Sequence, residues 1–138
     1  PARFSAALRH GNVSVLFLTT ALFNQYVQMI PEALGGLRVL ISGGERADPA
    51  SFRALLALAP GLHLLNGYGP TETTTFATAY DVRALASSAE SVPIGRPIGN
   101  TRVYVLNAQQ RLAPLGVIGE LYIGGDGVAL GYLNRPEL

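Results

Sequence analysis

The sequence predicts an α/β fold in which a parallel sheet flanked by helices is followed by short antiparallel strands. In the first half, three short apolar runs alternate with helical patterns, and parallel strands need such crossover connections. From Pro93 onwards, short strand patterns alternate with Gly- and Pro-rich turns, as in antiparallel sheets. We therefore expect one segment, 1–138, with an α/β core at 1–91 and mostly antiparallel strands at 92–138.

The elements of the first half are predicted from apolar runs and helix-end signals. Asp48 followed by Pro49 indicates a helix start, because Asp caps helices and Pro favours their first turn. Strands are expected at Val13–Leu18, Leu37–Ile41 and Leu62–Leu65. Helices are expected at Phe4–His10, from Thr19 or Thr20 to about Ile30 with a stop at Pro31, and at Pro49–Leu58. With right-handed crossovers this arrangement is flavodoxin-like.

The second half is predicted with shorter elements. Thr73–Tyr80 is rich in Thr and aromatic residues and favours a strand, while Val82–Ala89 is typical of a short helix or a loop. Arg102–Leu106 and Gly119–Ile123 are expected to be antiparallel strands.

Composition excludes several classes of function. The chain has a formal net charge of +1 and no basic patch, so nothing indicates nucleic-acid binding. There are no cysteines, and the two histidines, His10 and His63, have no spaced partners that would suggest a metal site. Apolar runs are shorter than the ~20 residues that span a bilayer, so no membrane association is expected and the chain is expected to be cytoplasmic.

Candidate sites follow two of the predicted strands, because ligands bind beyond the carboxyl ends of parallel strands. The first, Ser42-Gly43-Gly44, is interpreted as a tight turn. In the second, Asn66–Glu72, Tyr68 offers a face for stacking a base, Thr71 a hydroxyl for a phosphate oxygen, and Glu72 a carboxylate for Mg²⁺. Taken alone, the second stretch is also compatible with a Gly/Pro turn between two strands.

The glycine-rich stretch Gly119–Leu133 is interpreted as structural. It lacks the Lys-Ser/Thr pair of a phosphate-binding P-loop and does not precede a helical pattern. Ser42 is not in a nucleophile elbow and has no nearby His, so a hydrolase is not indicated.

Two motifs carry a resemblance to a known family. Asn66–Glu72 is similar to the N-x-Y-G-P-T-E signature of the adenylate-forming superfamily, and Gly119–Leu133 resembles the G-E-L-x-I-x-G-x-G-V-A-x-G-Y-L signature of its peptide-synthetase branch. Val92–Ile98 and Asn134–Glu137 also match this branch. The chain is therefore identified as an internal piece of an adenylation domain of a nonribosomal peptide synthetase. It departs from the pattern at Leu130, where the family usually has Arg, with no expected effect on the fold.

The resemblance implies an ATP-dependent ligase that uses Mg²⁺. A carboxylate attacks the α-phosphate of ATP, and the acyl group then passes to a phosphopantetheine thiol on a peptidyl carrier protein. By resemblance, Tyr68 stacks on adenine, Asn66 bonds its amino group, and Glu72 helps to hold Mg²⁺ and acts in catalysis with Thr71. The implied nucleotide-binding residues are Gly44, Glu45, Asn66, Gly67, Tyr68, Gly69 and Thr71.

The resemblance also places an amino-acid pocket at Phe17, Ile41, Gly43, Gly67, Thr75 and Phe76. This lining carries no charge and two glycines leave room, which suits a branched aliphatic side chain, valine first and isoleucine second. The phosphate loop and the aspartate that holds the substrate amino group are expected upstream, and the ribose-binding aspartate and catalytic lysine downstream. The chain alone is therefore expected to be inactive.

Two alternatives remain open at the level of sequence. One is an acyl-CoA or aryl-acid ligase of the same superfamily, against which the peptide-synthetase form of the second motif argues. The other is a folded binding module without catalysis, against which the intact Thr71 and Glu72 argue.

Overall fold

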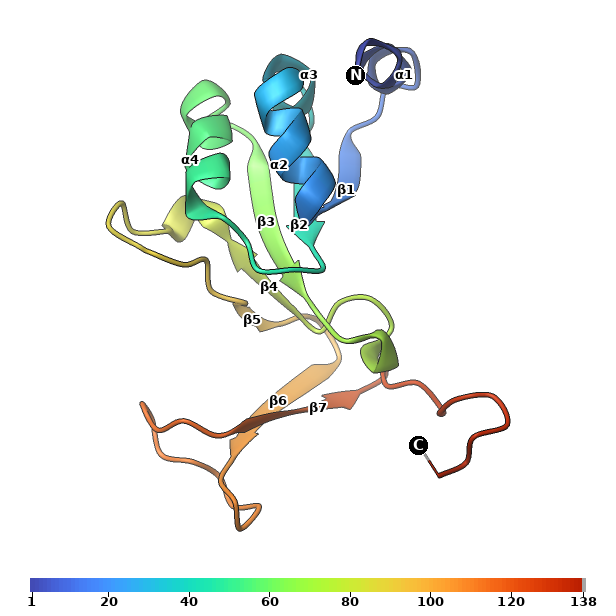
Figure 1. Cartoon of the computed structure of the whole chain (residues 1–138), viewed down its shortest axis with the longest axis vertical. Coiled ribbons are helices and arrows are strands. Elements are labelled where there is room, and N and C mark those ends of the chain that lie inside the picture. The colour runs from blue at the N-terminus through green and yellow to red at the C-terminus, as the bar shows by residue number, and fades with distance from the viewer. Residues whose placement is uncertain (138) are drawn as a thin grey trace. The chain divides into compact units, whose positions relative to one another are not determined.

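The computed structural model describes residues 1–137 and confirms the predicted α/β class. A five-stranded, mostly parallel sheet is accompanied by helices, and a separate two-stranded sheet is antiparallel (Figure 1). The helices are α1 (Ala2–His10), α2 (Thr20–Met29), α3 (Pro31–Gly35), α4 (Pro49–Leu58) and the short 3-10 helices η1 (Thr71–Thr73) and η2 (Val82–Ala84). The strands are β1 (Val15–Thr19), β2 (Val39–Gly43), β3 (His63–Tyr68), β4 (Thr78–Asp81), β5 (Arg96–Pro97), β6 (Thr101–Leu106) and β7 (Glu120–Gly125).

The larger sheet has the order β1-β2-β3-β4-β5, and β1, β2 and β3 are parallel as predicted. Both crossovers, from β1 to β2 and from β2 to β3, step in the same direction across the sheet. Crossovers of one hand that step in one direction lie on the same face of a sheet. Accordingly α2, α3 and α4 pack on one another in a single layer beside these strands (Figure 1).

Alternation along the strands shows which face the helices cover. Leu40 in β2 and Leu64 in β3 are fully buried and belong to the hydrophobic core, together with Phe23 of α2 and Phe52 of α4. The rings of Phe23 and Phe52 lie 4.5 Å apart between centroids, within the range of favourable aromatic pairs. Side chains at odd positions of these strands, such as Phe17 and Ile41, face the other way and are exposed or half buried, whereas Gly43 and Gly67, near the strand ends, are buried.

Several boundaries differ from the prediction, and β1 and β2 each begin two residues later than expected, at Val15 and Val39. Ser42 and Gly43 are the last residues of β2 rather than a turn, and β3 continues through Asn66 to Tyr68. The reason is pairing: Ser42 is in register with Asn66, and these pairs supply the backbone hydrogen bonds of the sheet. Pro31 does end α2, but it also begins α3, at the position where Pro needs no N–H.

The helix predicted at Pro49–Leu58 is confirmed. The Asp48 side chain accepts hydrogen bonds from the backbone N–H groups of Ala50 (3.0 Å) and Ser51 (3.3 Å). The stretch expected as one strand at Thr73–Tyr80 instead divides into part of η1, a loop and β4. Strands β6 and β7 confirm the predicted antiparallel pair.

The chain divides into two compact units. The first comprises Pro1–Gly67 and Ala79–Gly95, and the second comprises Tyr68–Thr78 and Arg96–Leu138. Among residues 1–137, no helix is long and apolar enough to cross a bilayer.

Candidate functional site

In the first unit, four predicted pocket residues lie on one face of the sheet. Phe17 of β1 is in register with Ile41 of β2, and Gly43 of β2 is in register with Gly67 of β3. Ile41 and Gly43 are two residues apart in one strand, so their side-chain positions share a face. The four positions therefore form a continuous patch that runs from the middle of β1 and β2 to the carboxyl ends of β2 and β3.

This patch lies on the face that helices α2, α3 and α4 leave uncovered. Phe17 is 42% exposed, whereas Leu40 and Ser42, which point to the other face, are both fully buried. The lining is apolar, and the two glycines leave it without side-chain bulk near the strand ends. Such a surface suits the apolar part of a small ligand.

Gly44 and Glu45 follow β2 directly, in an exposed loop of the first unit. Gly44 has φ +102°, a conformation that favours glycine. The Thr20 hydroxyl, at the start of α2, donates to the carbonyl oxygen of Glu45 over 3.3 Å. This contact ties the loop to α2 and leaves the Glu45 side chain exposed.

Asn66 is a buried polar residue of the candidate site, with 4% of its surface exposed. Its side-chain Nδ2 donates a 2.9 Å hydrogen bond to the carbonyl oxygen of Pro93. A carbonyl oxygen only accepts, so this bond fixes which end of the amide carries the nitrogen. The amide oxygen is then the acceptor that the side chain offers to a ligand. Asn66 and Gly67 are neighbours in β3 and point to opposite faces of the sheet.

In the second unit, the loop after Tyr68 closes tightly on itself. The backbone N–H of Ala77 donates to the carbonyl oxygen of Tyr68 over 2.8 Å. A Cβ atom at Gly69 would lie 2.7 Å from both Ala77 N and Thr75 O, closer than real Cβ atoms approach. Only glycine therefore allows this close approach of backbone to backbone.

Two successive threonines in this loop have left-handed backbone conformations. Thr74 has φ +54° and Thr75 has φ +80°. Such values are outliers for β-branched residues, and strain of this kind clusters at binding and catalytic sites. Thr75 and Phe76, the other two predicted pocket residues, both belong to this unit.

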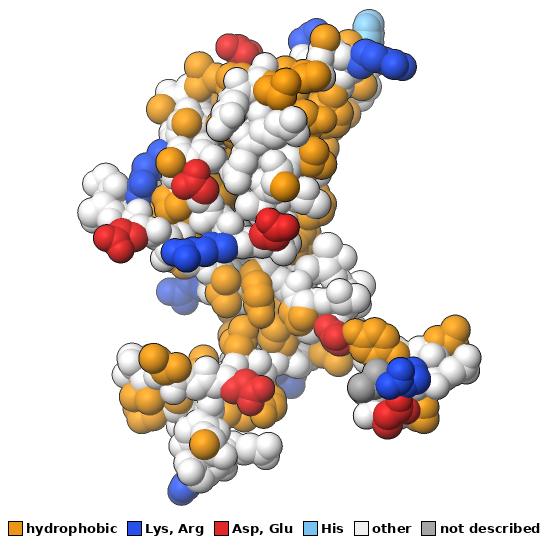
Figure 2. All heavy atoms as spheres, viewed as in Figure 1, with side chains coloured by type: hydrophobic (Ala, Val, Ile, Leu, Met, Phe, Trp, Pro, Cys, Tyr) orange, Lys and Arg blue, Asp and Glu red, His pale blue; other side chains and the backbone are white. Residues whose placement is uncertain are grey.

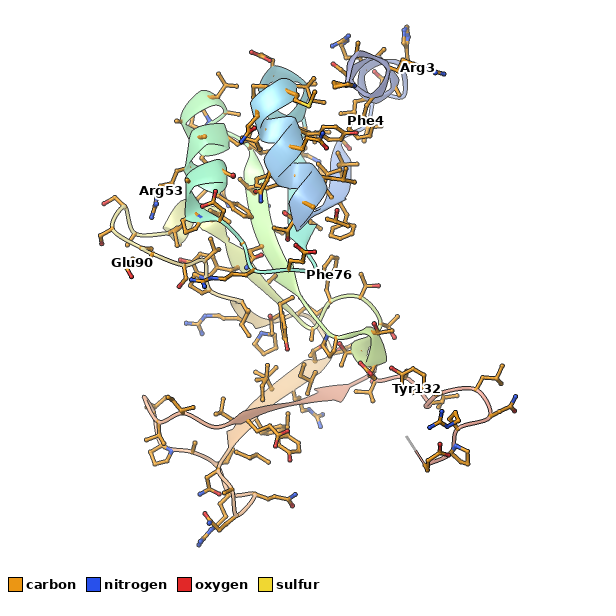
Figure 3. All side chains as sticks on the ribbon, viewed as in Figure 1. Arg3, Phe4, Arg53, Phe76, Glu90 and Tyr132 are labelled. Carbon is orange, nitrogen blue, oxygen red and sulfur yellow. The ribbon has the colours of Figure 1, made fainter. Side chains whose placement is uncertain are left out.

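Thr71 and Glu72 lie in η1, and both are exposed. The Tyr132 hydroxyl donates to Oε1 of Glu72 over 2.5 Å, and Figure 3 shows the Tyr132 side chain beside η1. This hydrogen bond is the main reason that the pKa of the Glu72 carboxyl lies below its ordinary value. The same bond raises the pKa of Tyr132. The bond thus favours the charged form of Glu72.

The oxygen donors around Glu72 fit a magnesium ion that arrives with a nucleotide. Within residues 1–137, no three His, Cys, Asp or Glu side chains group together to hold a metal by themselves. Mg²⁺ is usually bound by one or two carboxylates together with substrate phosphates and water. One exposed carboxylate next to the Thr71 hydroxyl meets that description.

Sequence reasoning missed the role of the second motif in forming this loop. The backbone N–H of Ala129 donates to the carbonyl oxygen of Glu72, and the Thr74 hydroxyl donates to the carbonyl oxygen of Gly127, both over 2.8 Å. The sequence pattern of the second motif indicates only a structural role. The one sequence signal for its contact with the Glu72 loop is that the motif contains Tyr132, whose hydroxyl can donate to a carboxylate. Leu130, in the same motif, is fully exposed.

Comparison with known proteins gives a consistent set of relatives. A family model described as AMP-binding enzyme matches residues 1–133. The chain is 51% identical over 138 residues to malpibaldin synthetase of Mortierella alpina, covering all of this chain. It is 51% identical over 132 residues to a protein of the linear gramicidin synthase of Brevibacillus parabrevis, covering 96% of this chain. In both cases it spans only 2% of the relative's length.

Solved structures show the same fold. PA1221, an NRPS protein containing adenylation and PCP domains, superimposes with a TM-score of 0.87 at 36% identity, over 93% of this chain and 26% of that one. The N-terminal subdomain of Klebsiella oxytoca NpsA, in complex with 3-hydroxybenzoyl-AMSN, gives a TM-score of 0.86 at 30% identity. That match covers 95% of this chain and 32% of the other.

Proposed function

This chain belongs to the AMP-binding enzyme family, and we propose that it is part of an adenylation domain of a nonribosomal peptide synthetase that activates an amino acid. In the proposed reaction a carboxylate oxygen of the amino acid attacks the α-phosphorus of ATP. The bond from that phosphorus to the bridging oxygen breaks, which releases pyrophosphate and leaves an aminoacyl-adenylate. The observation that carries the proposal is the 51% identity to two peptide synthetases over nearly the whole chain.

The nucleotide is proposed to bind at the carboxyl end of β3 and in the loop that follows it. Asn66 offers its amide oxygen to the adenine amino group, because its nitrogen is already engaged by Pro93. Tyr68 supplies a ring for stacking, with Gly44 and Glu45 on the other side of the base. The Gly67 and Gly69 backbones pass close to the ligand, and the Thr71 hydroxyl bonds the α-phosphate.

Glu72 is the residue proposed to hold Mg²⁺. The ion, when bound with ATP, supplies neutralisation of phosphate charge. Glu72 contributes a carboxylate, and the hydrogen bond from Tyr132 lowers its pKa and so favours the charged form. Thr71, one residue earlier, orients the phosphate that is attacked, and positioning of this kind accounts for much of the catalysis expected here.

The amino-acid side chain is proposed to contact Phe17, Ile41, Gly43 and Gly67, with Thr75 and Phe76 completing the lining. The first four share one face of the sheet and none of them carries a charge, which supports an uncharged, branched aliphatic substrate. We propose valine, with isoleucine as the second choice. One methylene changes binding by only about 1–3 kcal/mol, so both are expected to react to some extent.

The second step is proposed to be transfer to a carrier protein. The phosphopantetheine thiol of a peptidyl carrier protein attacks the acyl carbon, AMP leaves, and a thioester forms. The relative PA1221 contains both adenylation and PCP domains, which supports such a partner. The chain by itself is proposed to be inactive, since the relatives that it matches are far longer.

An aryl-acid ligase is a second candidate, because NpsA was solved with a 3-hydroxybenzoyl compound. The lower identity to NpsA, 30% against 51% to the two peptide synthetases, favours the amino acid.

The test is ATP–pyrophosphate exchange in a complete adenylation domain that carries this segment, with the isolated segment alongside. The panel contains the standard amino acids and 3-hydroxybenzoate. Exchange that is highest with valine, weaker with isoleucine and absent from the segment alone is the expected result. A preference for charged or aromatic amino acids would refute the pocket assignment, and a preference for the aryl acid would establish the second candidate.

A further inference from the structure

We infer that Tyr132 is a positioning residue for the Glu72 carboxylate, so that the end of the glycine-rich second motif, from Gly127 to Tyr132, serves the metal site as well as the fold. Tyr132 lies 60 residues after Glu72, and both belong to the second unit. This inference rests on the proposed role of Glu72 in holding Mg²⁺. It adds a residue that acts on the ion through Glu72 and does not touch it.

Two hydrogen bonds to backbone carbonyl oxygens place the motif beside the loop without help from the tyrosine ring. Ala129 N–H donates to the carbonyl oxygen of Glu72, and the Thr74 hydroxyl donates to the carbonyl oxygen of Gly127. A Cβ at Gly127 would lie 3.0 Å from the carbonyl oxygen of Thr73, so the two segments are in close contact there. The motif is therefore fixed along the loop next to Glu72.

The tyrosine hydroxyl adds a specific contact to the side chain. It donates to Oε1 of Glu72 over 2.5 Å, the range of short O–H···O⁻ hydrogen bonds to a charged acceptor. Glu72 is exposed, and an exposed glutamate samples many rotamers. Holding Oε1 fixes the carboxylate in one orientation and leaves Oε2 to bind a cation.

The space next to this pair is suited to a small polar ligand. A cavity of about 260 Å³ lies between the loop and the motif, with Thr71 and Glu72 on one side and Gly131 and Tyr132 on the other. Both oxygen donors assigned to the phosphate and its metal ion therefore line the same cavity as the tyrosine. Figure 2 shows the exposed side chains around this part of the second unit.

A chemically matched pair elsewhere in the chain provides the control. The Tyr122 hydroxyl donates to Oε2 of Glu120 over 3.1 Å on β7. This pair is also exposed and contains the same two residue types, but this hydrogen bond stays within β7 and does not reach the loop at Glu72. Y122F and Y132F thus remove the same atom from similar pairs.

The experiment uses the complete adenylation domain that carries this segment. Mn²⁺ affinity is measured by electron paramagnetic resonance with a non-hydrolysable ATP analogue, and exchange is measured over a series of Mg²⁺ concentrations. Y132F is expected to bind Mn²⁺ about 10-fold more weakly, as is typical when the partner of a ligating side chain is removed. High Mg²⁺ should restore its exchange rate, while KM for the amino acid and the properties of Y122F stay unchanged.

A double-mutant cycle separates positioning from other roles. If Tyr132 acts through Glu72, Y132F has no further effect on Mn²⁺ affinity in an E72Q background. Additive losses, parental Mn²⁺ affinity in Y132F, or an unfolding temperature of Y132F well below that of Y122F would each overturn the inference. Absence of ATP–pyrophosphate exchange in the unmodified domain is a different result. It refutes the proposed function, whatever the role of Tyr132.

Discussion

The side-chain amide of Asn66 is anchored by the carbonyl oxygen of Pro93, 27 residues further along the chain. This 2.9 Å hydrogen bond joins the end of β3 to the segment that precedes β5. It orients the amide so that its oxygen is available to accept from a ligand. Two stretches that match the same family, Asn66–Glu72 and Val92–Ile98, are therefore connected by one side chain.

Replacing Asn66 with Asp tests this connection. A carboxylate oxygen would face the Pro93 carbonyl oxygen, and two acceptors repel where a donor is required. We expect the free energy of unfolding to fall by about 1–3 kcal/mol and KM for ATP to rise. Chemical denaturation and exchange kinetics of the complete domain measure both. Asn12→Asp, the same change at an exposed position, serves as control, and equal stability of the two variants would contradict the prediction.

Gly95 is expected not to tolerate a side chain. Its φ is +88°, and a Cβ atom there would lie 1.9 Å from the carbonyl oxygen of Ala79. We expect Gly95→Ala to cost about 3 kcal/mol or more in unfolding free energy, from clash and backbone strain together. Gly61→Ala is the control, because nothing lies within 4 Å of a Cβ at Gly61. Similar unfolding midpoints for the two variants in denaturant would refute this prediction.

Asp48 is expected to stabilise α4 in a pH-dependent manner. Its pKa is lowered mainly by the hydrogen bond from the backbone N–H of Ala50. The stabilisation is therefore fully present above the pKa of Asp in the unfolded chain, roughly 3.9, and is lost as the pH falls through the lower folded value. Asp48→Ala should cost about 1 kcal/mol at pH 7.

The check on Asp48 is denaturation of the parent domain and of Asp48→Ala from pH 7 downwards. Their difference in stability should be constant near neutrality and should shrink below about pH 4. Asp48→Asn keeps a side-chain oxygen for Ala50 and should lose less than Asp48→Ala. A difference that grows on acidification would show that the sign is wrong.

Thr75 is expected to trade stability for function. Its φ of +80° costs a β-branched residue about 1–3 kcal/mol. Glycine adopts this φ without strain, but it loses about 0.5–1 kcal/mol more in backbone entropy on folding. Thr75→Gly should therefore leave unfolding free energy unchanged or raise it, while KM for the amino acid rises. The matched change Thr101→Gly, in β6 with ordinary strand geometry, should lower stability. Loss of stability in both variants would argue against strain at Thr75.

Much of the first unit could be predicted from local rules. The helix at Pro49–Leu58 is signalled by its cap and its first-turn proline, and both lie beside it in sequence. The ends of β2 and β3 could not be predicted in this way, because Ser42-Gly43 and Asn66-Gly67 are typical turn residues. Pairing between the strands outweighs that preference, since each pair satisfies buried backbone groups.

The candidate site also has a part that local rules predict and a part that they do not. Strand alternation is enough to predict that Ile41 and Gly43 share a face, and parallel pairing adds Phe17 and Gly67. The contact between Tyr132 and Glu72 joins residues 60 apart through a loop in which threonines adopt left-handed geometry. No propensity rule predicts such geometry for β-branched residues, which instead favour strands.

The alternation of side chains along β1, β2 and β3 separates the residues of the core from those of the proposed pocket. Even-numbered positions such as Leu40 and Leu64 belong to the buried core, whereas odd-numbered positions such as Phe17 and Ile41 lie on the less buried face, where we propose that the substrate binds. The side chains of the proposed pocket can therefore be changed, by evolution or by engineering, without disturbing the packing beneath them. A single-residue deletion within β2 would have the opposite effect, because it would exchange the two sets and place pocket residues in the core.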